Sequence, residues 1–143
     1  GAGGRDIHPS STHGVLVRIY PDGSVAQPEN PVTRSPHYSG IQKVIIATRD
    51  AGLAREAYSN GLGLPADPSQ ADPDRGVVSS IVRPPKGGII ELLSPIDTSR
   101  QIGAEIEEFL NSKGEGIFAL VLDADSDVRD RDINIFGTRI LIS

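Results

Sequence analysis

Short apolar runs separated by turn-forming residues make up most of the hydrophobic pattern of this chain. The runs are rich in isoleucine, valine and leucine, and this β-branched content in short segments is typical of β-strands. They predict strands at six places: residues 14–20, 41–48, 77–83, 88–94, 117–123 and 138–142. Between the third and fourth of these, the run Pro84-Pro85-Lys86-Gly87 predicts a hairpin turn.

Helical spacing of apolar residues separates several of the predicted strands. The first predicted helix covers 51–60, begins after Asp50 as its N-cap and ends at Gly61. A second helix is predicted over 102–111, and a third over 125–135. Strands and helices therefore alternate, which is typical of the α+β and α/β classes.

Two polar, proline-rich segments interrupt this pattern. Residues 21–40 contain four prolines and no hydrophobic period, so we expect a linker there. Residues 65–76 are also polar and rich in proline, which predicts a loop or a poor edge strand.

The composition narrows the classes of function. A chain of 143 residues suits one domain with a real core, and its net charge of -5 argues against non-specific binding to nucleic acid or to an anionic membrane. The chain has no cysteine, which excludes disulfides, thiolate nucleophiles and cysteine-ligated zinc. No apolar run approaches the length of a membrane span and no signal-peptide core begins the sequence, so we expect a cytoplasmic protein.

Two segments resemble a known superfamily. Residues 41–50, with Ala57-Tyr58 and Gly61-Leu62-Gly63-Leu64 after them, resemble the opening of a vicinal-oxygen-chelate (glyoxalase/bleomycin-resistance/dioxygenase) module. Residues 88–95 and 109–117 look like the middle of a methylmalonyl-CoA epimerase. The resemblance implies an α+β fold in which paired βαβββ modules form a curved mixed sheet around a pocket.

The N-terminal segments also resemble this family, but in an unusual order. Residues 1–5 and 8–18 are similar to its closing strands, which normally follow a segment such as 137–141. One interpretation is a circularly permuted single domain, 1–143. In it, 1–20 are closing strands of the second module, 21–40 a linker, 41–98 the first module, 99–116 a connecting helix and 117–143 the start of the second module. The other is a fragment of a tandem protein, and a homodimer that exchanges strands or modules would also complete the second sheet.

The resemblance implies four ligand positions on the concave pocket. Carried over by motif, they fall on Lys43, Glu91, Ala119 and Arg18. Metal-binding members have His, Glu or Gln at these positions, whereas protonated Lys and Arg offer no lone pair and Ala offers no donor. We therefore expect no metal and no other cofactor.

The three charged residues of this set admit two interpretations. The first is a buried ion-pair cluster that fills the former metal cavity, because paired charges are less costly to bury than single ones. The second is an anion pocket, in which Arg18 and Lys43 bind a carboxylate or a thioester-enolate oxygen and Glu91 is a candidate proton-transfer base.

Other residues that attract attention fit simpler roles. We expect His8, His13 and His37 to be turn or surface histidines, although His8 and His13 would be the candidates for a metal shared with Glu91. The glycines at 1–4 lack the following helix of a phosphate loop. Residues 123–127 lack the glycine and final glutamate of a calcium loop.

These observations lead to one main functional hypothesis and two rivals. The main one is a divergent, metal-free glyoxalase-like protein that binds a small organic molecule in the sheet-lined pocket, with a carboxylate or an acyl thioester as the candidate ligand. A purely non-catalytic binding protein, similar to the drug-sequestering branch of the superfamily, is a separate class beside it. The first rival is an isomerase or lyase of acyl-CoA epimerase type, which removes a proton next to a carbonyl. The second is a structural half of a larger tandem protein.

Overall fold

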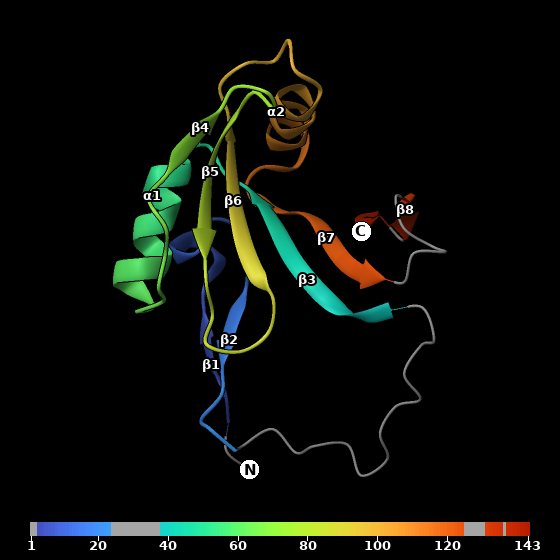
Figure 1. Ribbon diagram of the computed structural model, residues 1–143. Helices are drawn as coiled ribbons and strands as arrows, with labels where there is room; N and C mark the ends of the chain where they lie inside the picture. Colours follow the sequence, from blue (N-terminus) through green and yellow to red (C-terminus); the bar gives the residue numbers. More distant parts are fainter. Residues whose placement is uncertain (1–2, 24–37, 125–130, 136) are drawn as a thin grey trace.

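A seven-stranded mixed sheet forms the body of the molecule (Figure 1). The computed structural model describes residues 3–23, 38–124, 131–135 and 137–143. In spatial order the sheet contains β4 (Gln70–Asp72), β5 (Val77–Val82), β6 (Ile89–Pro95), β3 (Tyr38–Ala47), β7 (Gly116–Ala124), β9 (Thr138–Ile142) and β8 (Arg131–Ile135). The structure thus confirms five of the predicted strands, at residues 41–48, 77–83, 88–94, 117–123 and 138–142. The polar segment of residues 65–76 includes an edge strand, β4, which is one of its two predicted forms.

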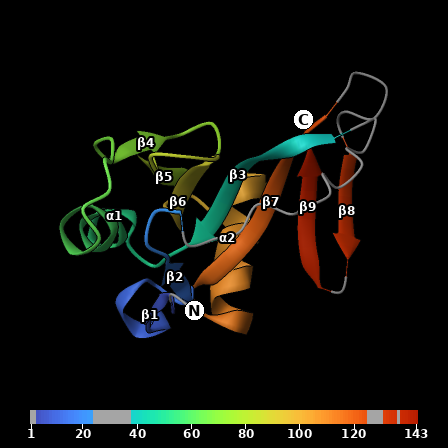
Figure 2. The same cartoon turned by 90° about the horizontal axis from the view of Figure 1, so that it is seen from below.

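The two halves of this sheet repeat one pairing pattern. β3 runs parallel to β6, which pairs antiparallel with β5, and β7 runs parallel to β9, which pairs antiparallel with β8. β3 and β7 join the halves as an antiparallel pair at the centre, and Figure 2 shows β7, β9 and β8 continuing the sheet beyond β3. This mixed α+β architecture agrees with the class predicted from the sequence.

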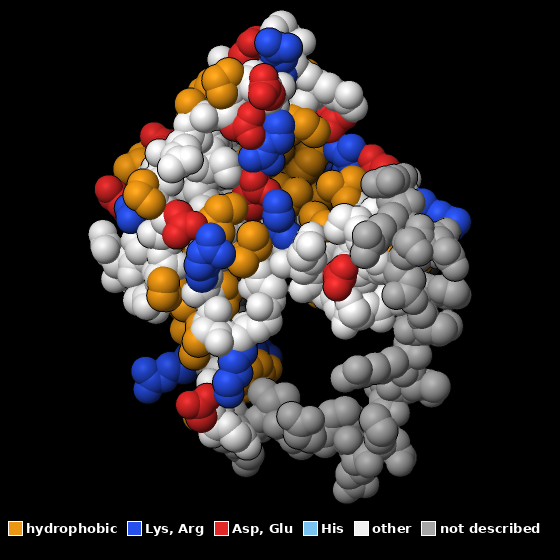
Figure 3. Space-filling view, viewed as in Figure 1, with side chains coloured by type: hydrophobic (Ala, Val, Ile, Leu, Met, Phe, Trp, Pro, Cys, Tyr) orange, Lys and Arg blue, Asp and Glu red, His pale blue; other side chains and the backbone are white. Residues whose placement is uncertain are grey.

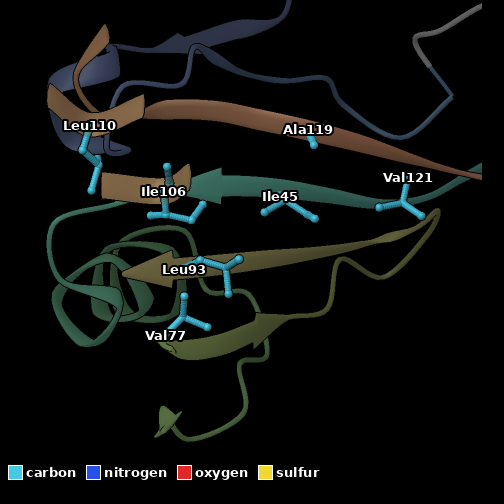
Figure 4. Packing of buried hydrophobic residues seen from close by; sticks show 8 residues of the cluster. Ile45, Val77, Leu93, Ile106, Leu110, Ala119 and Val121 are labelled. Atoms are coloured by element: carbon cyan, nitrogen blue, oxygen red, sulfur yellow. The ribbon is translucent and has the colours of Figure 1, made fainter. Parts of the chain in front are cut away.

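Helices cover opposite faces of the first half of the sheet. Helix α2 (Gln101–Lys113) packs on one face, which we call the α2 face. Its buried cluster contains Ile45, Ala47, Val77, Leu93, Ile106, Leu110, Ala119 and Val121 (Figure 4). The other face, the α1 face, lies under α1 (Ala51–Glu56) and its continuation η2 (Ala57–Gly61), with Ile46, Ala54, Tyr58, Val82 and Leu92 buried. Neighbouring residues such as Ile45 and Ile46 belong to different clusters because side chains alternate along a strand.

Local sequence explains where the helices begin and end. The Asp50 carboxylate accepts hydrogen bonds from the backbone N–H groups of Gly52 and Leu53 at 2.8 and 3.0 Å, so the predicted N-cap is confirmed. Gly114, at a φ of 80°, follows the end of α2 and adopts a backbone conformation that favours glycine. Among the described residues, neither helix is long and apolar enough to cross a membrane.

The N-terminal segment forms a separate two-stranded ribbon. β1 (Arg5–Ile7) pairs antiparallel with β2 (Val17–Ile19), and the short helix η1 (Pro9–Ser11) lies between them. The expectation that the strand containing Val15 and Val17 lies in the same sheet as β7 and β9 is therefore wrong for the single chain. Val15 and Val17 pack instead against the cluster of the α1 face.

The predicted helix over 125–135 is also wrong where it can be checked. Arg131–Ile135 is strand β8, whereas residues 125–130 lie outside the described part of the chain. Ile133 and Ile135 alternate along β8 and pair with Ile140 and Thr138 of β9. A short alternating segment of β-branched residues beside an available strand favours pairing over a helical turn. Most of the predicted linker, residues 24–37, lies outside the description as well.

Candidate ligand site on the α2 face

A buried carboxylate lies at the centre of the candidate site. Glu91 of β6 has a side chain that is only 3% exposed. Its Oε2 atom accepts a hydrogen bond from Lys43 Nζ at 2.8 Å. Its Oε1 atom accepts bonds from Arg75 Nη2 at 2.8 Å and from Ser79 Oγ at 3.0 Å. Both carboxylate oxygens are therefore satisfied, as a buried charge requires.

Sheet register places three of these side chains on one face. Glu91 lies opposite Ile45 of β3 and Ile81 of β5, so it points to the α2 face with Ile45. Lys43 and Ser79 are each two residues from those partners and share the same face. Figure 3 shows basic and acidic side chains gathered over β5, β6 and β3, with apolar side chains beside them toward β7.

Arg75 reaches the site from the turn between β4 and β5. Asp72 holds it twice, because its Oδ1 accepts from the Arg75 backbone N–H at 3.1 Å and its Oδ2 from Arg75 Nε at 2.6 Å. The guanidinium thus bridges a half-exposed carboxylate and the buried one of Glu91. A guanidinium group suits such two-sided recognition, because its five N–H donors lie in one plane and point outward in different directions.

These contacts set the charge state of Glu91. Burial raises the pKa of the Glu91 carboxyl, but the hydrogen bonds and positive charges of Lys43 and Arg75 outweigh it and lower that pKa below its usual value. The hydrogen bond from Arg75 likewise lowers the pKa of Asp72. Glu91 is therefore an anion at neutral pH, held between two cations.

A pocket of about 330 Å³ opens beside this cluster. Arg75 and Ser79, which both contact Glu91, form part of its wall. The remaining lining comes from β4, the segments on either side of it and β5: Asp67, Pro68, Gln70, Ala71, Asp72, Pro73 and Ile81. A small polar molecule in this pocket would meet the guanidinium of Arg75 directly.

The structure brings together two of the four residues expected from the family motif. Lys43 and Glu91 are in contact, and Ala119 lies on the same face opposite Ile45, fully buried in the core. Arg18 is elsewhere, because β2 is in the N-terminal ribbon, where its guanidinium pairs with Asp6 at the surface. The expected cluster of Arg18 with Lys43 and Glu91 is thus wrong, and Arg75 supplies the second cation.

Three residues of the site, Arg75, Ser79 and Asp72, were not predicted from the sequence. Arg75 and Asp72 belong to the run Asp72-Pro73-Asp74-Arg75-Gly76, which has the composition of a tight turn but carries no sign of what the turn faces. Ser79 lies in a strand predicted from its apolar neighbours.

The two histidines in the described part of the chain form their hydrogen bonds away from Glu91. His8 Nδ1 lies 2.9 Å from Ser10 Oγ, and His13 Nδ1 lies 3.0 Å from Glu115 Oε2. His37 falls outside the described residues. The idea that His8 or His13 shares a metal with Glu91 is therefore wrong, since each is bonded elsewhere.

The donor set around Glu91 does not suit a metal ion. A divalent ion needs several carboxylate, imidazole or similar donors, and the groups that reach Glu91 are an ammonium, a guanidinium and a hydroxyl. Across the described residues, no three His, Cys, Asp or Glu side chains come together as a metal-binding group. The residues do not fit the ion that the superfamily resemblance implies.

Comparisons with known proteins place this chain by its fold. No protein-family model matches the sequence, and no curated protein matches it. Among solved structures, methylmalonyl-CoA epimerase from Mycobacterium tuberculosis is similar, with a TM-score of 0.57 and 22% identity over 73% of this chain and 87% of that chain.

Two further epimerase structures, both with bound ligands, are similar. The enzyme from Streptomyces coelicolor, in complex with 2-nitronate-propionyl-CoA, has a TM-score of 0.58 and 15% identity, over 73% of this chain and 96% of that one. A methylmalonyl-CoA epimerase in complex with methylmalonyl-CoA and NH4+ has a TM-score of 0.56 and 17% identity, over 73% and 93%. At these identities the likeness shows the fold alone.

Proposed function

We propose that this chain, which has the vicinal-oxygen-chelate fold of the similar epimerase structures, binds a small acyl thioester or carboxylate beside Glu91 without a metal ion. The observation that carries this proposal is the meeting of Lys43 and Arg75 at one buried carboxylate next to a pocket. The ligands of the epimerase structures, which are acyl-CoA compounds, support the thioester as the ligand class.

Both cations keep donors for a ligand. Among the described residues, the Lys43 ammonium bonds only to Glu91, although it has three N–H groups. Arg75 uses Nε for Asp72 and Nη2 for Glu91, so its Nη1 group keeps its donors. The two side chains are 26% and 36% exposed, hence within reach of a molecule in solution. A carboxylate or thioester oxygen would accept charge-assisted hydrogen bonds from both.

Binding can be measured by calorimetry with methylmalonyl-CoA, propionyl-CoA and free CoA. We expect the acyl thioesters to bind and free CoA to bind more weakly, since it lacks the acyl oxygen. Lys43→Met and Arg75→Met should each weaken binding about tenfold or more, because each removes charge-assisted hydrogen bonds. Arg18→Met is the matched control, since Arg18 lies in the ribbon and should leave the affinity unchanged. Equal affinity for free CoA and the thioesters would contradict the proposal.

A second function, epimerase-type isomerisation, is supported by the same neighbours. It requires Glu91 to remove the proton next to the thioester carbonyl, and a general base works best when its pKa lies near the operating pH. In the free protein the pKa of Glu91 is instead shifted away from neutral pH, because Lys43 and Arg75 lower it. Turnover would require a ligand oxygen to take over those two hydrogen bonds, which would leave a buried carboxylate with a raised pKa and greater basicity.

Hydrogen exchange separates binding from turnover. In D2O, an isomerase replaces the hydrogen on the carbon between the two carbonyls of methylmalonyl-CoA with deuterium, which NMR detects. An exchange rate above the uncatalysed rate that is lost in Glu91→Gln and retained in Arg18→Met would establish Glu91 as the base. Binding without exchange would leave the protein as a non-catalytic ligand binder.

Completion of the second half of the sheet by a second copy stays a proposal. The described part of that half contains β7, β9 and β8, and β8 is an edge strand with all five residues exposed. A homodimer that exchanges residues 1–20 would elute at twice the monomer mass in size-exclusion chromatography with light scattering. A truncated chain lacking these residues would then elute as a monomer.

A further inference from the structure

The turn that carries Arg75 packs against the first turn of α2. The Gly103 backbone N–H donates to the Arg75 carbonyl oxygen at 3.0 Å. The Gly76 carbonyl oxygen accepts from the N–H groups of Ile96 and Asp97 at 2.9 and 3.1 Å. The carbonyl groups of Arg75 and Gly76 are thus hydrogen-bonded to α2 and to the segment that leads into it. In this way the turn also satisfies a free N–H group at the start of that helix.

Two glycines make this close approach feasible. A methyl group on Gly103 would overlap the carbonyl oxygen of Asp97 and lie 2.7 Å from that of Gly76. A methyl group on Gly76 would also overlap the Asp97 carbonyl, and Gly76 has a φ of +71°, which disfavours other residues. At these two positions, therefore, only glycine fits without a shift of the backbone.

We propose that Gly103 is a positioning residue for the ligand site, because it lets α2 dock against the turn closely enough to fix the guanidinium of Arg75 between Asp72 and Glu91. This proposal rests on the proposed function for its effect on ligands. The geometry by itself predicts the effect on Arg75. Gly103 does not line the pocket, so any effect on binding must pass through the turn.

A substitution at Gly103 tests this coupling, with Gly61→Ala as the matched control. Gly61 ends η2, and a methyl group there would meet nothing within 4 Å. The readout is the Arg75 Nε–H signal in the NMR spectrum, which exchanges slowly with water while Nε donates to Asp72. We expect Gly103→Ala to displace the turn and lose this protection, and Gly61→Ala to keep it. Retained protection in Gly103→Ala would overturn the proposal.

Ligand affinity provides the second readout. Gly103→Ala should weaken methylmalonyl-CoA binding about tenfold, as expected when charge-assisted hydrogen bonds lose their geometry. In the Arg75→Met background the same substitution should have no further effect, and independent, additive losses would contradict a role through Arg75. If the wild-type protein binds none of the thioesters, the proposed function fails, whereas the Nε–H signal still decides whether Gly103 positions Arg75.

A variant without a steric clash covers the case in which Gly103→Ala does not fold. Ile106→Ala deletes buried contacts of α2 on the α2 face and loosens the helix. Val82→Ala is the control, an equally buried truncation on the α1 face. Only Ile106→Ala should speed exchange of the Arg75 Nε–H and weaken binding. The same behaviour in both variants, or in neither, would contradict the coupling between α2 and Arg75.

Discussion

The Lys43 ammonium and the Glu91 carboxylate meet at 2.8 Å although 48 positions separate them in the sequence. Their strands, β3 and β6, run parallel, and Lys43 lies beside Ile89, two residues from Glu91 on the same face. A long lysine side chain spans this diagonal distance easily. The contact therefore depends on the register of the sheet, and it holds a buried negative charge in place.

Replacing the buried carboxylate should destabilise the fold. Glu91→Gln leaves Lys43 and Arg75 facing each other without an anion, which we expect to lower the free energy of unfolding by about 3–5 kcal/mol, the typical cost of breaking a buried ion pair. Urea denaturation measures this. Arg18→Met, which removes a surface ion pair in the ribbon, should have little effect, and equal effects of the two variants would show that the Glu91 cluster contributes no more than a surface pair.

An added anion should partly rescue the same variant. In Glu91→Gln the two cations are left with a neutral partner, so propionate in the buffer should bind beside them, supply the missing negative charge and raise the melting temperature. The rise should exceed that of the wild-type protein at equal ionic strength, with chloride as the control salt. No difference between propionate and chloride would indicate that the site excludes carboxylates.

Acid should lower the free energy of unfolding of the wild-type protein more than it lowers that of the Glu91→Gln variant. The pKa of Glu91 in the folded protein lies below its usual value of 4.5. A lowered pKa means that the unfolded chain binds a proton more readily, so the stabilisation is complete above the usual pKa and is lost as the pH falls through the lowered value. The difference in unfolding free energy between the two proteins should therefore shrink from pH 6 toward about pH 3. A constant difference across this range would show that Glu91 has the same pKa in both states.

Metal should play no part in stability. Purified protein should contain no stoichiometric divalent ion, and EDTA should leave its melting temperature unchanged. Around Glu91 the ammonium and the guanidinium offer no lone pair, and one serine hydroxyl beside one carboxylate is too small a donor set for a divalent ion. Elemental analysis and a thermal melt with and without EDTA provide the test. One zinc, nickel, cobalt or manganese ion per chain would reveal a site formed by residues other than this cluster.

The docking of the ribbon can be tested through Tyr58. Its hydroxyl donates to the Thr12 carbonyl oxygen at 3.1 Å, and burial raises the pKa of Tyr58 to about 12. Tyr58→Phe should cost about 1 kcal/mol of unfolding free energy in the full chain, the usual net value of a hydrogen bond. In a chain lacking residues 1–20 the same substitution should cost nothing, and an equal cost there would mean that the ribbon does not dock through this bond.

Strand periodicity predicted most of the sheet, whereas Lys43 and Glu91 were expected at the site because of the resemblance to the superfamily motif. Side-chain alternation along β3 and β6 agrees with one common face for these two residues. The motif also placed Arg18 there, but neither the motif nor alternation reveals which strand a segment pairs with. Residues 17–19 of the predicted strand 14–20 pair with β1, so Arg18 pairs with Asp6 and not with Glu91.

The features that escaped prediction depend on tertiary contacts. Arg75 lies in a turn whose position is fixed by α2, and no local pattern shows that the turn reaches Glu91. A helix was expected at strand β8 because its 5 residues are too few to show a hydrophobic period clearly. Its pairing with β9, a contact outside the segment, decides the outcome.

The parallel pairing of β3 with β6 also has a consequence for the order of folding. β5 and β6, like β8 and β9, are neighbours along the chain and form local antiparallel pairs, so we expect them to pair early. Pairing β3 with β6 closes a long crossover that contains α1, β4 and β5, and because closing a long loop carries an entropic cost, we expect this pairing to follow. Lys43 and Glu91 belong to these two strands, so we expect their contact to be absent from the folding transition state. A substitution that breaks this contact should therefore speed unfolding more than it slows folding.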